Sequence, residues 1–178
     1  MGNIQRFRPF AVVWMALLLA AALSAAGELV SVHPRLSLAP DVFAVGQTSE
    51  VFLCVTNGSV GVNGTLRRGD KFIATFGAAS GSIDSFEATA YVNSATLRPS
   101  DFSVQRGASS NQLVIYYVGV TKSFVPGDTV CAKLSVAAPA AVGSGKIRFE
   151  WVLNGMSYAG YYEYIELLSP VKDGRARF

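Results

Sequence analysis

Beyond residue 27 the apolar side chains recur at every second position, and this alternation limits what the chain can fold into more than any other feature. The segment 129–137, for example, reads TVCAKLSVA, with an apolar side chain at each even-numbered position. A strand with one buried face has this period of two, whereas an amphipathic helix repeats every three to four residues. The sequence therefore predicts an all-β fold.

The alternating segments number about eight, and residues typical of turns separate them. Because no helices are present to make parallel crossovers, strands at this spacing favour an antiparallel two-sheet sandwich, immunoglobulin-like or jelly-roll-like. A closed barrel is the alternative architecture. The predicted strands are Leu29–Leu38, Glu50–Thr56, Lys71–Phe76, Ser85–Val92, Gln112–Val120, Thr129–Ala137, Lys146–Leu153 and Met156–Leu167.

The first 26 residues have the pattern of a signal peptide. Arg6 and Arg8 precede an apolar run at 10–23, and the small residues of 24–26 follow it. This order of charged, apolar and small residues is typical of a cleaved leader, although an apolar run of this length also suits a retained anchor. We expect cleavage and export, with the mature protein in the periplasm, at the cell surface or in the medium.

Removal of the leader leaves one predicted sandwich domain, residues 27–170, and a short basic tail, residues 171–178. Two of the 15 lysines and arginines lie in the leader, which leaves 13 against 12 acidic residues. A nearly neutral body has no basic stripe to neutralise phosphates, so we expect no nucleic-acid partner. No further apolar segment is long enough to span a membrane once the leader is cleaved.

The two cysteines, Cys54 and Cys131, lie in different predicted strands. An even number of cysteines in an exported protein usually means a disulfide, so we predict that they are paired. In both strands the alternation places the cysteine on the less apolar face. A bond between two outward faces joins strands of one sheet, unlike the core disulfide of antibody domains.

The sequence around Asn154-Gly155 predicts a β-hairpin, because this pair favours a two-residue type I′ turn. The turn fixes the register of the two strands. It predicts the apolar pairs Leu153–Met156, Trp151–Tyr158, Phe149–Gly160 and Ile147–Tyr162, and the polar pairs Lys146–Glu163 and Arg148–Tyr161. This register places Tyr162 in the core and leaves Tyr161 on the polar face.

Three tyrosines are candidates for an exposed ligand surface. Tyr161 lies among polar residues in the predicted register, and Tyr116 and Tyr117 point to opposite faces of a strand that is apolar on both sides. Flat aromatic side chains exposed on a sandwich suit recognition of glycans or proteins. The other aromatic residues of the hairpin are expected in the core.

Two Gly-Asp pairs precede alternating strands, at Gly69-Asp70 and Gly127-Asp128. Glycine accepts the positive φ of a turn, and aspartate bonds neighbouring backbone amides, so both pairs suit the start of a strand. Arg68-Gly69-Asp70 is also the tripeptide that integrin-type receptors recognise. The sister turn has proline in place of arginine, which favours the structural interpretation.

The sequence offers little for catalysis. His33 is the only histidine, and the aspartates are scattered rather than grouped in a metal-binding loop. We therefore predict no catalytic residue, no metal and no cofactor. A hydrolase that uses two carboxylates remains an alternative, because distant acids can meet across a cleft.

The Gly-Asp strand starts, the alternating strands and the Asn-Gly hairpin resemble those of bacterial extracellular immunoglobulin-like and cohesin-like modules, over roughly residues 29–168. The chain lacks the signature residues of antibody domains. It has Thr129 two positions before Cys131, where antibody domains have a tyrosine before their second cysteine. The resemblance implies a non-catalytic module that recognises a protein or glycan at the cell surface, or serves as a structural unit of the envelope. A carbohydrate-binding module is the alternative.

Overall fold

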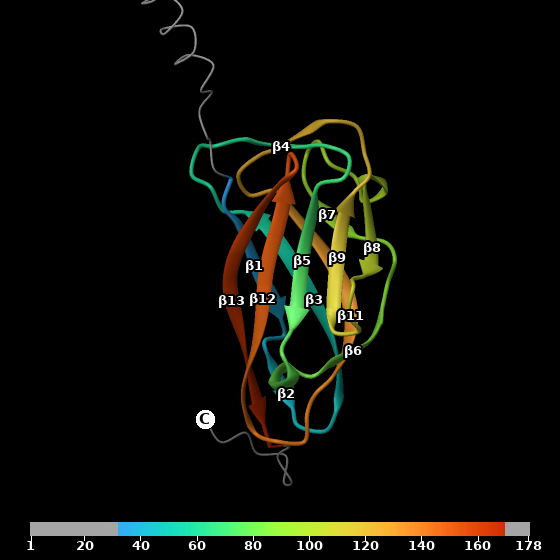
Figure 1. Ribbon diagram of the computed structural model, residues 1–178, viewed down its shortest axis with the longest axis vertical. Coiled ribbons are helices and arrows are strands. Elements are labelled where there is room, and N and C mark those ends of the chain that lie inside the picture. The colour runs from blue at the N-terminus through green and yellow to red at the C-terminus, as the bar shows by residue number, and fades with distance from the viewer. Residues whose placement is uncertain (1–31, 170–178) are drawn as a thin grey trace, which may run out of the picture. The chain divides into compact units, whose positions relative to one another are not determined.

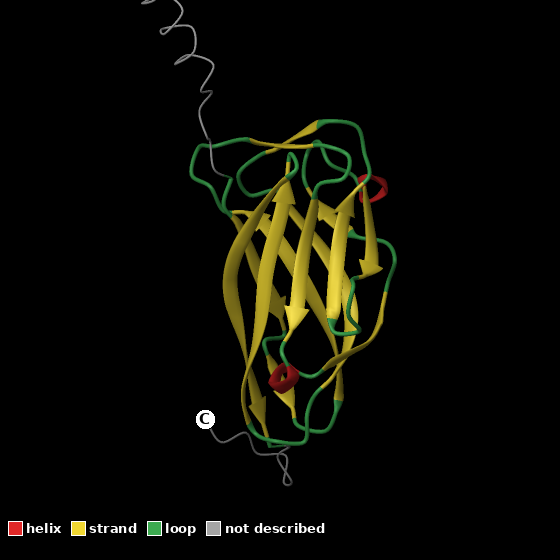
Figure 2. Cartoon of the chain, in the orientation of Figure 1, coloured by secondary structure: helices red, strands yellow, loops and turns green. Residues whose placement is uncertain are grey.

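The computed structural model describes residues 32–169 of the 178-residue chain. The predicted leader, 1–26, and the predicted tail, 171–178, lie outside the described residues. So do the first residues of the predicted domain 27–170 and of the predicted strand Leu29–Leu38. Strands make up most of the described part, and two 3-10 turns, η1 (Ala78–Ser80) and η2 (Pro99–Asp101), are its helical elements (Figure 2).

Two sheets pack face to face as a sandwich (Figure 1). One sheet has the order β1-β3-β11-β6, with β7 also paired to β11, and the other has the order β2-β13-β12-β5-β9-β8. The short strands β4 and β10 pair with each other in a separate two-stranded sheet. All pairings among the described residues are antiparallel except the parallel pair of β2 with β13. The strands are β1 (Pro34–Ala39), β2 (Val42–Ala44), β3 (Thr48–Asn57), β4 (Gly64–Leu66), β5 (Lys71–Phe76), β6 (Ser82–Phe86), β7 (Tyr91–Asn93), β8 (Phe102–Arg106), β9 (Gln112–Tyr117), β10 (Lys122–Phe124), β11 (Thr129–Ala137), β12 (Gly143–Leu153) and β13 (Met156–Leu168).

One hydrophobic core fills the space between the sheets. In β11 the alternate side chains that point inward are at most 2% exposed, and their neighbours are half-exposed. The same alternation runs along β3, β5 and β12. The predicted all-β antiparallel sandwich is therefore confirmed. The sequence prediction missed short strands, above all β2, β4, β8 and β10, and merged β6 and β7 into one segment.

A disulfide joins Cys54 of β3 to Cys131 of β11. These strands are neighbours in one sheet, the two residues lie directly opposite each other, and their Cα atoms are 4.0 Å apart. Farther along the same strands the hydroxyls of Thr56 and Thr129 are hydrogen-bonded at 2.8 Å. The prediction of a bond within one sheet, on its outer face, is confirmed.

The hairpin of β12 and β13 has the predicted turn and the predicted register next to it. Asn154 and Gly155 both have positive φ, of 53° and 77°, as a type I′ turn requires. Leu153 lies opposite Met156, and Trp151 lies opposite Tyr158 with their rings stacked at 5.7 Å.

A β-bulge at Phe149 ends the predicted register. The pairing shifts by one residue between Arg148 and Glu150, so Lys146 lies opposite Tyr164 and Arg148 opposite Tyr162. The predicted pairs Lys146–Glu163, Arg148–Tyr161 and Ile147–Tyr162 are therefore wrong, and Phe149 faces both Gly160 and Tyr161. Glycine fits here because a Cβ on Gly160 would lie 2.0 Å from the Phe149 carbonyl oxygen. One extra residue exchanges the faces of all that follow, so Tyr161 turns inward and Tyr162 outward.

The two Gly-Asp pairs are equivalent turns at the starts of β5 and β11. Asp70 accepts a hydrogen bond from the Arg67 N–H, and Asp128 accepts one from the Val125 N–H, both at 2.8 Å. The preceding glycines have φ of +97° and +88°, in the region that favours glycine. Asp70 also accepts a hydrogen bond from the Asn154 N–H at 2.8 Å, which ties this turn to the hairpin tip. A carboxylate that is 3% exposed and used in this way is structural.

Candidate binding surface

Tyr117 does not belong to a ligand surface, and that prediction is wrong. Its side chain is 1% exposed and packs edge-on against Phe102 at 5.2 Å. Its hydroxyl donates a hydrogen bond to the Val120 carbonyl, which satisfies the polar end of a buried tyrosine. The strand is apolar on both sides, so its sequence could not show which face is the more deeply covered.

The other two predicted tyrosines lie on opposite sides of the six-stranded sheet. Tyr116 is half-buried on the outer face, where the Lys71 ammonium lies 5.7 Å from the ring centre. Tyr161 lies on the inner side, with its ring 5.8 Å from that of Phe149 and 36% of its surface exposed. Its hydroxyl accepts a hydrogen bond from the Leu36 N–H of β1. Tyr161 therefore bridges the two sheets instead of lying on the polar face.

The bulge instead exposes Tyr162 and Tyr164. They are 52% and 55% exposed and lie two residues apart on the outer face of β13. The Lys146 ammonium of β12 lies 5.6 Å from the centre of each ring, within the range of a cation–π contact. Sequence reasoning missed this arrangement. The available signal was Gly160 inside a strand pattern, which often marks a bulge.

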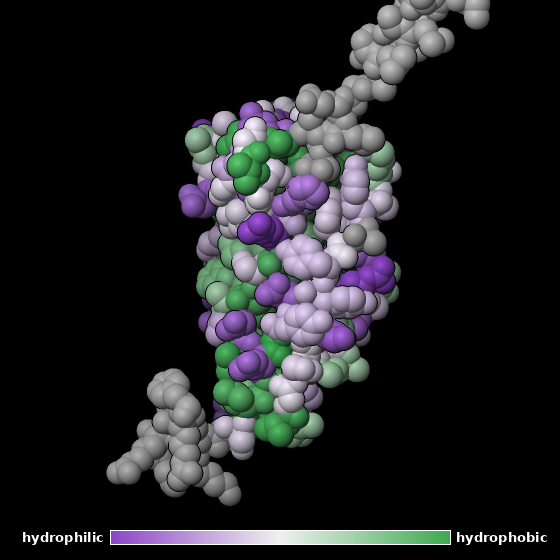
Figure 3. All heavy atoms as spheres, turned by 90° about the vertical axis from the view of Figure 1, so that its left-hand side faces the viewer, coloured by the Kyte–Doolittle hydropathy of each residue, from purple (hydrophilic) through white to green (hydrophobic). Residues whose placement is uncertain are grey.

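Charged residues of β12 continue the same outer surface. Arg148 lies opposite Tyr162, and its guanidinium forms an ion pair with Glu150 at 2.9 Å. Lys146 has no ion pair with any carboxylate among residues 32–169. We call Tyr162, Tyr164, Lys146, Arg148 and Glu150 the tyrosine surface. Figure 3 views the molecule from the side of β13, where side chains of intermediate hydropathy cover the middle of the molecule.

The edge of β13 next to the tyrosine surface is only partly paired. On the side away from β12, β2 pairs with Glu166 to Leu168, and the Glu166 N–H donates to the Asp41 carbonyl at 2.9 Å. From Ser157 to Tyr164, β13 has no strand on this side within the described residues. In Figure 1 this stretch lies at the left margin of the sheet.

Glu163 points from this edge toward the interior and has no ion pair in the described part of the chain. It shares the inner side of β13 with Ile165 and Leu167, which are buried. Burial raises the pKa of the Glu163 carboxyl, and the nearby Asp41 carboxylate raises it further. The ionised form is therefore disfavoured in the folded state.

Glu163→Gln is expected to stabilise the protein by about 0.5 kcal/mol at pH 7, a small gain because solvent screens a half-exposed group. A carboxyl whose folded pKa is raised lowers stability only when it is ionised, so this cost grows as pH rises through the raised pKa. Below about pH 4 the Glu163 carboxyl is protonated in both the folded and the unfolded state, so the gain disappears. Urea unfolding of both proteins across this range measures it.

Glu166→Gln is the matched control for this prediction, since Glu166 lies on the exposed face of the same strand. We expect a smaller change in stability from it, because its side chain is already exposed to solvent. An equal gain in both variants, or a gain from Glu163→Gln that persists at low pH, would contradict the assignment of the effect to the half-buried Glu163 carboxylate.

A second group of charges lines a shallow hollow on the other sheet, beside Phe86 and Ser135. Lys133 forms ion pairs with Glu50 at 3.4 Å and with Glu87 at 3.2 Å. Hydrogen bonds from Tyr91 and Lys133 lower the pKa of Glu87. A general acid for glycoside hydrolysis requires the opposite shift. The pair of carboxylates therefore gives the hydrolase alternative no support.

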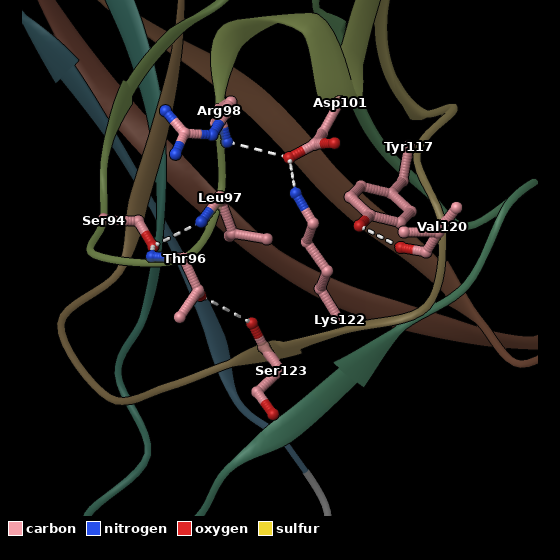
Figure 4. A network of polar contacts seen from close by, with 9 residues as sticks. All are labelled: Ser94, Thr96, Leu97, Arg98, Asp101, Tyr117, Val120, Lys122 and Ser123. Atoms are coloured by element: carbon pink, nitrogen blue, oxygen red, sulfur yellow. Dashed lines mark hydrogen bonds and ion pairs between the residues drawn. The ribbon is translucent and has the colours of Figure 1, made fainter.

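A third polar cluster ties loops together at one end of the sandwich (Figure 4). Asp101 accepts hydrogen bonds from Lys122 Nζ at 2.7 Å and from the Arg98 N–H at 2.8 Å. Burial raises the pKa of this carboxyl, but the two donors outweigh burial and hold the pKa below its usual value. The donors thus keep Asp101 ionised, which fits a structural role.

No three His, Cys, Asp or Glu side chains within residues 32–169 come together in a set that could hold a metal ion. Within the same residues, no helix has the length and hydropathy needed to cross a membrane.

A scan against protein-family models and a search of the curated proteins found no match. Solved structures that match include the N-terminal domain of the Streptococcus gordonii adhesin Sgo0707, at 10% identity and a TM-score of 0.49. This match covers 79% of the present chain and 34% of the adhesin chain, so the chain spans about a third of that protein's length.

Two further matches are of similar quality. The sixth cohesin of Acetivibrio cellulolyticus scaffoldin B, solved with a dockerin, has 13% identity and a TM-score of 0.46, with 76% and 99% of the two chains covered. The collagen-binding subdomain of the Enterococcus faecalis surface protein ACE has 10% identity and a TM-score of 0.41, with 76% and 97% covered. The chain thus has a weak, fold-level resemblance to bacterial adhesin, cohesin and collagen-binding domains.

Proposed function

We propose that the chain is an exported, non-catalytic recognition module that binds a partner protein through the tyrosine surface. The observation that carries the proposal is the exposure of Tyr162 and Tyr164 on one face, with Lys146 between them and without an acidic partner in the described residues. A sandwich needs no such cluster for its own stability. Burying these rings against a partner would remove apolar surface from water.

Tyrosine is well suited to this role. It supplies a large, rigid contact area at a low entropic cost, and its hydroxyl remains able to form hydrogen bonds. Tyrosine and arginine are enriched in protein interfaces, where a few such residues supply most of the affinity. The tyrosine surface contains both residue types, with Arg148 opposite Tyr162.

Two features support an exported protein. The sequence pattern of residues 1–26 is that of a signal peptide. The Cys54–Cys131 disulfide is of the kind that persists in oxidising compartments outside the cytoplasm. We therefore infer that the module acts in the periplasm, at the cell surface or in the medium.

Glycan binding is a second candidate, favoured by the spacing of Tyr162 and Tyr164. Side chains two positions apart on a strand are about 7 Å from each other, a separation that suits stacking on successive sugar rings. Against it, the Lys146 ammonium lies over one face of each ring and competes with a sugar for that face. Lys146→Ala would therefore strengthen glycan binding but weaken binding to an acidic protein surface.

The test is a binding screen of the purified protein against arrays of purified extracellular proteins and of glycans. We expect selective binding to a protein, and the double variant Tyr162→Ala/Tyr164→Ala is expected to lose about a hundredfold in affinity for it. Tyr91→Ala is the matched control, because Tyr91 is 45% exposed on the other sheet.

Unchanged binding by the double variant would overturn the proposal, as would an equal loss in Tyr91→Ala. Binding to glycans alone, strengthened by Lys146→Ala, would establish the second candidate in its place.

A further inference from the structure

We propose that the unpaired edge of β13, from Ser157 to Tyr164, binds an extended peptide strand of a partner protein that carries a lysine or arginine opposite Glu163. This inference rests on the proposed function and names the partner's binding mode. An added strand along this edge would also place alternate side chains beside the tyrosine surface.

The backbone groups that face this edge follow from the hairpin. Residues that close a two-residue turn exchange hydrogen bonds, so Met156 faces β12 and Ser157 faces the edge. The backbone groups continue to alternate between the two sides of β13 as far as Ala159. The alternation shifts at the bulge, and beyond it the backbone N–H and C=O groups of Tyr162 and Tyr164 face the edge. The next residue in this series is Glu166, and its N–H does point to the edge, where it donates to Asp41.

The edge of β13 is thus a row of backbone N–H and C=O groups, and the C-terminal end of this row is already paired. β2 pairs with Glu166 to Leu168, and the rest of the row has no strand partner in the region that the structure describes. The unpaired N–H and C=O groups of an edge strand are a template for another strand. A peptide there would extend the six-stranded sheet beyond β2.

The facing strand of the other sheet does not compete for this position. The outward N–H of Leu36 in β1 donates to the Tyr161 hydroxyl. Tyr161 thus occupies the edge of β1 and leaves that of β13 uncovered. This arrangement favours addition to the six-stranded sheet.

Glu163 makes the edge selective. An inward-pointing charge on an edge strand discourages pairing, because an added strand would bury the charge without a partner. A lysine or arginine in the added strand removes this penalty by forming an ion pair with Glu163, in a region where Asp41 adds negative charge. An acidic or apolar residue at the same position is rejected.

The test uses fluorescent octapeptides of alternating threonine and valine as probes, with lysine, glutamine or glutamate at a central position. We expect the lysine peptide to bind the full chain about tenfold more tightly than the glutamine peptide, and the glutamate peptide to bind least. N-methylation of the alternate amides that face the edge should abolish binding. Equal affinities for the three peptides, or insensitivity to N-methylation, would overturn the inference.

Two protein variants locate the site. Ser157→Pro removes an N–H that points to the edge, a change that an edge strand tolerates. We expect it to weaken binding of the lysine peptide about tenfold, whereas Ser157→Ala keeps the N–H and should keep the affinity. Glu163→Gln should bind the lysine and glutamine peptides equally, while Glu50→Gln, at an exposed position of β3 in the other sheet, keeps the preference. Thermal unfolding verifies that each variant is folded, and loss of preference in both glutamine variants would contradict the role of Glu163.

The same variants separate this inference from the proposed function. If a partner protein no longer binds Tyr162→Ala/Tyr164→Ala but still binds Ser157→Pro, the tyrosine surface is established and strand addition is overturned. Lysine-dependent peptide binding without any effect of the tyrosine double variant on array partners would support the edge and overturn the tyrosine surface.

Discussion

Replacing Cys54 and Cys131 with alanine is expected to lower the free energy of unfolding by about 4 kcal/mol. The disulfide closes a loop with a sequence separation of 77 residues and thereby restricts the unfolded chain. In the folded state it joins two central strands of one sheet, which pair with each other at nine positions, so little native structure depends on the bond. Urea unfolding of the oxidised protein and of the double variant measures the loss.

Thr56→Val/Thr129→Val is the matched control for the disulfide. These residues lie opposite each other on the same two strands, and the change removes one half-exposed hydroxyl contact while it keeps the packing. We expect a change within about 1 kcal/mol. A loss of that same small size from the cysteine double variant would show that the bond adds little to stability.

Asp70→Ala is expected to destabilise the protein by about 3 kcal/mol. The carboxylate is buried and accepts hydrogen bonds from the N–H groups of Arg67 and Asn154, so its removal leaves two partly buried donors without this partner. The turn before β5 and the hairpin tip would lose their connection. Thermal and urea unfolding both report the change.

Two variants show whether this effect comes from the carboxylate alone. Arg68→Ala changes the exposed residue of the same tripeptide and should alter stability by less than about 0.5 kcal/mol. Asp128→Ala removes the equivalent bond in the sister turn, without a counterpart of Asn154, and should cost about half as much as Asp70→Ala. An equal cost for Arg68→Ala and Asp70→Ala would contradict the structural role of Asp70.

Local chemistry explains what the sequence predicted correctly. The period of two identifies strands and their buried faces because side chains alternate across a sheet. The same alternation placed Cys54 and Cys131 on outward faces, from which the bond within one sheet followed. Asn154-Gly155 fixed the turn because both residues tolerate positive φ.

The features that the sequence left open depend on contacts between distant residues. The bulge at Phe149 arises where two strands meet, and its only local sign is Gly160, whose missing Cβ permits the close approach to the Phe149 carbonyl. Without the bulge, the alternation sent Tyr161 outward and Tyr162 inward. Uninterrupted alternation of side chains therefore could not predict the tyrosine surface.

Tyr117 and the short strands illustrate two other limits. A strand that is apolar on both faces does not reveal which face is covered more, so the sequence could not show that Tyr117 belongs to the core between the sheets. Strands of three residues, such as β2 and β10, are too short to show any period. Their positions are set by the longer strands beside them.

The parallel pairing of β2 with β13 also determines how the domain responds to mechanical tension. Glu166, Leu167 and Leu168 pair with Val42, Phe43 and Ala44, so the first strand of this sheet in the chain lies beside the last. Once β1 has separated from β3, pulling on the two ends of the domain draws β2 and the end of β13 in opposite directions along their common axis. The short ladder then resists as a unit in shear, instead of opening one bond at a time from an end.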